Sequence, residues 1–356
     1  MKLTINRLLL LVLGLLYVLI SILRRSFYSE GLVDWKTIEI LATLIVINTG
    51  MMLSGGIDFI SYKLLGTTKS MRQLFFLSVL LTSFLAMVLT NDVTLLILIP
   101  LTVSIGKFTK KNVENIIIIQ AIAANVGSML TPFGNPQNII IFRTEHLTFF
   151  HFILIMLPPY IFSMIVLLLF VFLFRNDNLI AKSTPPVPNF SLFLSNLILL
   201  FSAIIFMLLD LNGLYFLLLI AVSLLILLFV EPEGLVRIDY ALIAVFILIF
   251  LVINSLKTLV EVPVINNPVY LYLYSLLLSQ FLSNVPTTVL FGKVSNWIPL
   301  AYGVDIGGNG TIIASLANLI ALRNISGKNF LKFNKYSFLF LAITAAFGLF
   351  ILHIYS

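Results

Sequence analysis

Cysteine is absent from this sequence of 356 residues, and histidine occurs only three times. Without cysteine the chain can form neither disulfide bonds nor thiolate metal sites, and it has no cysteine nucleophile. The histidines, His146, His151 and His353, lie at the ends of apolar segments and share no ligand spacing. We therefore interpret them as interfacial residues rather than as metal ligands.

Charge is also scarce. Only 10% of the residues are charged, whereas 60% are hydrophobic, and the mean hydropathy is +1.14. A water-soluble protein has about a quarter of its residues charged. Apolar stretches of about 20 residues, the length that crosses a bilayer, recur from end to end, so we predict an all-α polytopic membrane protein. The net charge of +7 does not indicate nucleic-acid binding, because the basic residues lie in short loops between apolar stretches.

Hydropathy predicts about nine full spans. They cover residues 7–27, 36–56, 115–142, 149–174, 191–209, 213–230, 237–256, 304–323 and 333–354. The first apolar run is long and lacks a small-residue cleavage site. We therefore expect a retained span rather than a signal peptide.

Two further apolar segments, 73–106 and 268–297, are interrupted near their middle. The first carries Thr90-Asn91-Asp92 and the second carries Ser283-Asn284-Val285-Pro286. The first is also too long for a single span of roughly 20 residues. We predict that each segment is a re-entrant hairpin of two half-length helices meeting at a polar tip. A backbone break at membrane depth is tolerated only where it is buried in protein or lines a wet cavity.

The distribution of basic residues supports this topology. With two hairpins, six of the 21 Lys and Arg residues fall on one side, and the other 15 fall on the side of the N-terminus. The six are Arg24, Arg25, Lys36, Arg143, Lys257 and Lys293. Cytoplasmic loops carry the excess of Lys and Arg. We therefore expect a plasma-membrane protein with a cytoplasmic N-terminus and its C-terminus outside.

The chain divides at a polar, proline-containing stretch, 175–190, which we interpret as an extended cytoplasmic linker. Residues 1–174 form a first repeat, 175–212 the linker and a connecting span, and 213–356 a second repeat. The repeats align by their interruptions. Thr90-Asn91 aligns with Ser283-Asn284. The broken span 115–142 aligns with the broken span 304–323, so that Gly127 pairs with Gly307, Thr131 with Thr311 and Asn138 with Asn318.

An odd number of crossings separates equivalent positions, so the repeats must be inverted. Inverted repeats with paired interrupted segments indicate a midplane binding site of a secondary transporter. The alternative is that the small and polar residues only help helices to pack.

The interruptions supply the candidate site. A broken helix exposes backbone N–H groups at one new end and carbonyls at the other. The N–H ends attract anions, whereas carbonyls with Asn, Ser and Thr oxygens suit Na⁺. The candidate substrate- and ion-binding residues are Thr90, Asn91, Asp92, Thr94, Gly134, Asn135, Asn138, Ser283, Asn284, Thr287, Thr288, Thr311, Ala314, Ser315 and Asn318.

Asp92 differs from the other candidates because it is the only acid that the predicted spans place at depth, and Val285 takes its position in the second repeat. A carboxylate inside the membrane is costly, which favours a role as proton carrier or cation ligand. The alternative is an N-cap for the outgoing half-helix, a position that Asp favours.

These motifs, with Gly134-Asn135-Pro136-Gln137-Asn138 and the stretch from Gly303 to Leu319, resemble the ion transporter superfamily. The nearest resemblance is to its arsenite/anion permease branch, which is citrate-transporter-like and related to the divalent anion:sodium symporters. The resemblance implies a scaffold domain and a mobile transport domain within a homodimer. It also implies sodium ligands at Asn91, Gly134, Asn284 and Ala314. Where the symporters carry Ser-Asn-Thr, this chain has Thr90-Asn91-Asp92 and Ser283-Asn284-Val285, and Asp92 fits the arsenite-permease or antiporter branches.

The function expected from the sequence is secondary active transport of a small anion, an inorganic oxyanion or a carboxylate, coupled to sodium or protons. A sodium/proton antiporter that uses Asp92 is the alternative, and a channel is a third interpretation. The sequence has no nucleotide-binding loop and no nucleophile–base pair at membrane depth, so we expect neither an ATP-driven pump nor an enzyme. We expect no cofactor apart from bound sodium ions.

Overall fold

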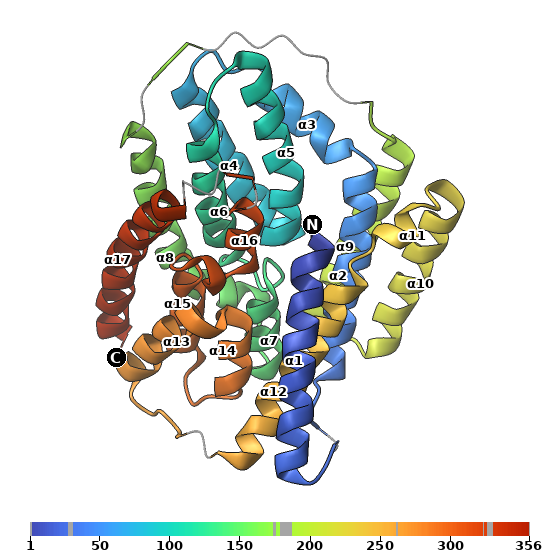
Figure 1. The fold of residues 1–356 in the computed structure, drawn as a ribbon, viewed down its shortest axis with the longest axis vertical. Coiled ribbons are helices and arrows are strands. Elements are labelled where there is room, and N and C mark those ends of the chain that lie inside the picture. The colour runs from blue at the N-terminus through green and yellow to red at the C-terminus, as the bar shows by residue number, and fades with distance from the viewer. Residues whose placement is uncertain are drawn as a thin grey trace. The chain divides into compact units, whose positions relative to one another are not determined.

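The computed structural model describes residues 2–27, 31–173, 176–178, 187–260, 263–322, 324–325 and 330–355. Within these ranges the regular elements are helices, and one isolated β-bridge joins Ser70 to Asn178 (Figure 1). Much of the predicted linker at 175–190 lies outside the described residues. Seven described helices are long and apolar enough to cross a membrane. The chain is therefore an all-helical polytopic membrane protein, as its composition predicts.

The contacts of the chain divide it into two compact units. The first comprises Met1–Leu53, Phe190–Val264 and Thr288–Gly292, and the second comprises Ser54–Asn189, Ile265–Thr287 and Lys293–Ser356. Each unit takes segments from both of the repeats expected from the sequence. The division by contacts thus cuts across the division by sequence, and the repeat boundaries stay a prediction.

The first unit contains α1 (Lys2–Arg24), α2 (Trp35–Leu53), α9 (Phe190–Leu208), α10 (Gly213–Val230), α11 (Gly234–Arg237) and α12 (Tyr240–Leu259). Helix α1 lies beside α12, and α2 packs against α9 and α10 (Figure 1). Val46, Leu192, Leu227 and Ile238 form a buried apolar cluster in this unit. Helix α10 is nearly uniform in hydrophobicity around its axis and few of its residues are buried, as expected for a helix that faces lipid.

The second unit contains α3 (Gly56–Leu65), α4 (Met71–Leu89), α5 (Asn91–Thr109), α6 (Glu114–Ser128), α7 (Pro136–Thr144), α8 (Phe149–Phe170), η1 (Val171–Leu173), α13 (Pro268–Leu282), α15 (Trp297–Gly307), η2 (Ile312–Ala314), α16 (Leu316–Leu322) and α17 (Phe330–Tyr355). Helices α4, α5, α6 and α16 lie together, as do α13, α15 and α17 (Figure 1). Helix α14 (Asn284–Phe291) is divided between the two units.

Two glycines that the repeat alignment pairs lie at close helix contacts in this unit. A Cβ at Gly127 of α6 would lie 2.1 Å from the carbonyl oxygen of Ser83 in α4. A Cβ at Gly307 of α15 would lie 3.1 Å from the carbonyl oxygen of Leu276 in α13. Small residues are what let helices pack backbone to backbone in a membrane protein. The paired glycines therefore allow close helix packing, which is the alternative role that the sequence analysis gave to small residues.

Most of the expected spans match described helices. Segments 36–56, 149–174, 191–209, 213–230, 237–256 and 333–354 each correspond to one of the seven candidate spans, and 7–27 corresponds to α1. The segments 115–142 and 304–323 are broken, as predicted. Helix α6 ends at Ser128 before α7 begins at Pro136, and α15 ends at Gly307 before α16 begins at Leu316.

The hairpin segments differ from the prediction in length. Segment 73–106 forms α4 and α5 of 19 residues each. At 1.5 Å per residue each helix is about 28 Å long, so the expectation of half-length helices was wrong here. Helix α4 is itself among the seven candidate spans.

The second hairpin segment is shorter than predicted. Helix α13 has 15 residues and α14 has eight, so the outgoing arm ends at Phe291 rather than near residue 297. Asn296 caps α15 by accepting a hydrogen bond from the backbone N–H of Ile298. This cap starts a new helix at Trp297, which adds residues 297–303 to the broken span.

Candidate functional site

The two polar tips share one backbone conformation. Thr90 joins α4 to α5 with φ 86° and ψ 150°, and Ser283 joins α13 to α14 with φ 75° and ψ 159°. A positive φ is uncommon outside glycine and strains a β-branched residue. The next residue at each tip is a buried asparagine whose side-chain oxygen accepts from the following N–H, at 2.9 Å in Asn91 and 3.0 Å in Asn284.

The breaks in the two broken spans are also built alike. The side-chain amide of Asn138 donates to the carbonyl oxygens of Ser128, Met129 and Thr131, each at 3.3 Å. The side-chain amide of Asn318 donates to the carbonyl oxygens of Gly308 at 2.8 Å and Thr311 at 2.9 Å. These bonds satisfy carbonyls that helix termination leaves without an intrahelical partner.

A threonine in each break bonds to the helix that leads into the corresponding tip. The hydroxyl of Thr131 donates to the carbonyl of Met87 in α4, and that of Thr311 donates to the carbonyl of Gln280 in α13, both at 2.7 Å. The backbone N–H of Asn91 also donates to the carbonyl of Gly134 at 3.1 Å. Each broken span is thus tied to one tip within the second unit.

Asn125 of α6, which the sequence analysis missed, lies at the centre of these contacts. Its side-chain oxygen accepts from the amide of Asn91 at 3.1 Å and from the hydroxyl of Ser315 at 3.0 Å. Its own amide donates to the side-chain oxygen of Asn318 at 3.0 Å and to the carbonyl of Gly308 at 3.1 Å. One buried amide therefore links the first tip to the second break.

Asp305 of α15 was also missed, and it corrects the expectation that Asp92 is the only acid at depth. Its side chain is 2% exposed. One carboxylate oxygen, Oδ1, accepts from the amides of Asn135 at 3.1 Å and Gln137 at 2.9 Å. The prediction failed because it started this span at 304, whereas α15 begins at Trp297 and buries Asp305 in its C-terminal part.

Asp92 lies in the first turn of α5 and is half-buried. The N-cap of α5 is Thr90, so the alternative role of Asp92 as the cap residue is wrong. A carboxylate in the first turn still interacts favourably with the exposed N–H groups of the helix.

The other predicted site residues lie in the helices and at the breaks that the sequence indicated. Thr94 is buried in α5, Thr287 is buried in α14, and Ala314 ends η2. Asn135 caps α7 by accepting from the N–H of Asn138 at 2.9 Å. Thr288 is also buried in α14, although the division by contacts assigns it to the first unit.

The alignment of the two repeats already pairs the two residues that the sequence analysis missed, Asn125 and Asp305. The register that pairs Gly127 with Gly307 also pairs Asn125 with Asp305, two positions earlier in each repeat. It likewise pairs Asn135 with Ser315. The structure uses these pairs in the same way, since Asn135 donates to Asp305 and Ser315 donates to Asn125. Extending the alignment by two residues would have found both acceptors.

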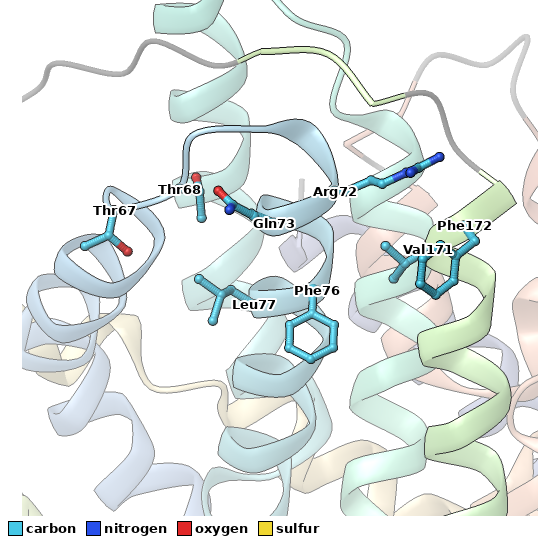
Figure 2. Close-up of a pocket in the computed structure, with 8 residues that line it drawn as sticks. All are labelled: Thr67, Thr68, Arg72, Gln73, Phe76, Leu77, Val171 and Phe172. Carbon is cyan, nitrogen blue, oxygen red and sulfur yellow. The ribbon is translucent and has the colours of Figure 1, made fainter.

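A separate pocket of about 430 Å³ lies in the second unit where α4 begins and η1 follows α8 (Figure 2). It is lined by Thr67, Thr68, Arg72, Gln73, Phe76, Leu77, Val171 and Phe172. The guanidinium of Arg72 lies over the ring of Phe172, 5.8 Å from its centroid. None of the predicted site residues lines this pocket, so it is not part of the candidate site.

Comparison with known proteins places the chain among transporters. A sequence model of the citrate transporter family matches residues 3–296. The chain is 37% identical over 321 residues to an uncharacterised transporter of Methanocaldococcus jannaschii, which covers 88% of the chain and 87% of that protein. It is 32% identical over 333 residues to the inner membrane protein YbiR of Escherichia coli, covering 89% of the chain and 87% of that protein. A shorter match, 31% identical over 122 residues, is to the putative transporter arsB of Dictyostelium discoideum, covering 34% of the chain and 22% of that protein.

The family match runs over most of the chain, and two of these relatives align along most of their own length. The resemblance inferred from the polar interruptions is therefore confirmed. The relatives are named as membrane proteins and transporters rather than as enzymes. The chain belongs to the citrate transporter family and is a membrane transporter.

Proposed function

We propose that this transporter moves a small anion, an inorganic oxyanion or a carboxylate, by a secondary active mechanism coupled to sodium or protons. The observation that carries the proposal is the pair of matched polar assemblies in the second unit. Each assembly combines a strained tip with a broken span, and the asparagines of both assemblies are buried. Packing alone does not require the same strained conformation to occur twice beside a broken helix.

The chemistry of these assemblies suits an anion and a cation together. Helices α5, α7 and α14 each begin at a tip or a break, and helix N-termini attract anions. The sodium ligands expected at Asn91, Gly134, Asn284 and Ala314 are carbonyl and amide oxygens, which hard cations prefer. The description of the family supports a carboxylate such as citrate, and the name of the relative arsB supports an arsenic oxyanion.

In the proposed cycle the second unit is the mobile transport domain and the first unit is the scaffold of a homodimer. The inverted repeats give alternating access, with the tip at Thr90 entering from the cytoplasmic side and the tip at Ser283 from the outside. The N-terminus is cytoplasmic and the C-terminus lies outside the plasma membrane. The bias of basic residues supports this orientation.

A sodium/proton antiporter is the second candidate, because the second unit places acids at the start of α5 and inside α15. An acid inside a membrane domain is expected to exchange or bind cations. In this mechanism no anion is transported, and Asp92 exchanges the two cations. A channel stays a third candidate.

Counterflow in proteoliposomes tests these candidates. We expect vesicles preloaded with unlabelled citrate or arsenite to accumulate the labelled compound transiently, because a carrier exchanges one solute for another and a channel does not. Sodium or proton exchange without movement of any tested anion would contradict the leading proposal and support the antiporter. Equilibration without transient accumulation would indicate a channel.

A further inference from the structure

The carboxylate of Asp305 is buried, and only one of its two oxygens accepts hydrogen bonds from the described residues. Its Oδ1 accepts from Asn135 and Gln137, whereas its Oδ2 is buried and has no hydrogen-bond partner among the described residues. An ionised carboxylate in such surroundings is very unfavourable without a counter-charge. In the ionised form of Asp305, this second oxygen accepts no hydrogen bond from a described side chain.

No described cationic side chain neutralises this carboxylate. Helices α6, α7, α8, α13 and α17 pack against α15. Their described ionisable side chains are Glu114, Arg143, His151, Tyr160, Tyr270, Tyr272, Tyr274, Lys332, Lys335, Tyr336 and His353. None of these is a hydrogen-bond or ion-pair partner of Asp305, and on α15 itself the hydroxyl of Tyr302 donates to the carbonyl of Ile155.

Gln137 supplies the complementary group. Its Nε2 donates to Asp305 Oδ1 at 2.9 Å, and its Oε1 is also buried without a hydrogen-bond partner. A carboxylic acid and a primary amide pair in a ring in which each group donates once and accepts once. One proton on Asp305 Oδ2 would close this ring by donating to Gln137 Oε1. That single proton satisfies both orphaned oxygens.

We propose that Asp305 binds the proton that is coupled to transport, and that Gln137 holds the protonated form as a cyclic acid–amide pair. The bond formed is the O–H bond on Oδ2, the proton comes from water on one side of the membrane, and its release restores the carboxylate. This inference rests on the proposed function and names its coupling ion and the site of that ion. It assigns the proton to Asp305 rather than to Asp92.

The first repeat provides an internal comparison. Asn125 holds the position that corresponds to Asp305, and its side-chain oxygen accepts two hydrogen bonds as the Oδ1 of Asp305 does. An amide is thus accommodated at this position of the fold. Asp305→Asn keeps Oδ1 as an acceptor and places an N–H where the acid proton would lie. The variant imitates the permanently protonated state and is expected to fold.

Difference infrared spectroscopy of the purified full-length protein tests the proposal without any transported solute. In sodium-free choline buffer, we expect lowering the pH to produce the C=O band of a buried carboxylic acid, with a shift in D₂O. Asp305→Asn should abolish the band, whereas Asp92→Asn should retain it. Gln137→Leu should move the band to higher frequency, because the C=O of the acid loses one donor. The Gln137 variant keeps the test decisive if Asp305→Asn fails to fold.

Three outcomes would overturn the proposal. They are a carboxylic acid band that persists in Asp305→Asn, no such band at any pH, or a band that sodium removes at constant pH. The last would make Asp305 a sodium ligand.

Transport by the same variant is measured in a separate experiment. Asp305→Asn should lose the accumulation of citrate or arsenite that a pH gradient drives in the wild-type protein. A band that behaves as expected in a protein that moves no solute would leave the proton site standing and refute only the proposed function.

Discussion

A single buried amide, Asn125, connects parts of the chain that are far apart in the sequence. It contacts Asn91, Ser315 and Asn318 through side chains that are themselves buried. A buried polar group that loses its partner costs about 1–3 kcal/mol. We expect Asn125→Ala to lower the free energy of unfolding by about 3 kcal/mol, measured as a fall in the apparent melting temperature of the purified protein.

Ser78→Ala is the matched control for this prediction. The hydroxyl of Ser78 in α4 is buried and has no hydrogen-bond partner among the described residues. Its removal should change stability by less than about 1 kcal/mol. Equal losses in the two variants would mean that the contacts of Asn125 do not stabilise the fold.

Asn91 and Asn284 test the shared ion site. Each is 4% exposed and follows the strained residue of its tip. We expect Asn91→Ala and Asn284→Ala each to weaken the dependence of transport on sodium or protons, because each removes a ligand oxygen. The measurement is the cation concentration for half-maximal uptake in proteoliposomes. If both variants keep the wild-type value, the shared site is wrong.

Asp92→Asn tests whether the carboxylate at the start of α5 takes part in coupling. We expect Asp92→Asn to abolish coupled transport and leave the protein folded, because a carboxylate in the first turn of α5 is placed to bind a cation near the tip. Uptake and its pH dependence are the measurements, with the melting temperature as the check on folding. Unchanged uptake with unchanged pH dependence would reduce Asp92 to a residue that stabilises the helix start.

At the scale of helices, the close approach of α6 to α4 depends on Gly127. A Cβ there would lie 2.1 Å from the backbone oxygen of Ser83, and backbone cannot move as a flexible side chain does. Overpacking of this kind typically costs 1–3 kcal/mol. We expect Gly127→Ala to destabilise the protein by about 2 kcal/mol or more, measured by thermal unfolding.

Gly14 offers a control in the same type of element. It lies within α1, and a Cβ at this position would meet nothing within 4 Å. Alanine is favoured over glycine in a helix by up to about 1 kcal/mol. Gly14→Ala should therefore be neutral or stabilising. A similar loss in both variants would show that the glycine contact between α4 and α6 is unimportant.

At the scale of the whole molecule, the proposed orientation can be measured directly, because the chain contains no cysteine that must first be removed. Lys110 and Lys293 are exposed and lie on opposite sides in the proposed topology. We expect an impermeant maleimide added to intact cells to label Lys293→Cys but not Lys110→Cys. The reverse pattern would invert the topology, and labelling of both would contradict it.

Much of this architecture follows from the sequence because it depends on local patterns. Long apolar stretches have to be helices in a bilayer, where every backbone polar group must be satisfied within its own segment. The breaks near Gly134 and Ser315 were also predictable, because Gly, Asn and Pro each make a helix less stable where they interrupt it. Helix ends were predicted less well. The cap at Asn296 starts α15 earlier than hydropathy indicates.

The sequence by itself determined the membrane class, the broken spans and the two tips, because hydrophobicity and helix-breaking residues act locally. Only the tertiary structure decided which polar groups meet. Asn125 and Asp305 are ordinary helix residues in the sequence, and they gain their roles from partners that lie as many as 193 positions away. The physical reason is that a buried polar group must find a hydrogen-bond partner wherever packing provides one, and packing is set by the whole fold.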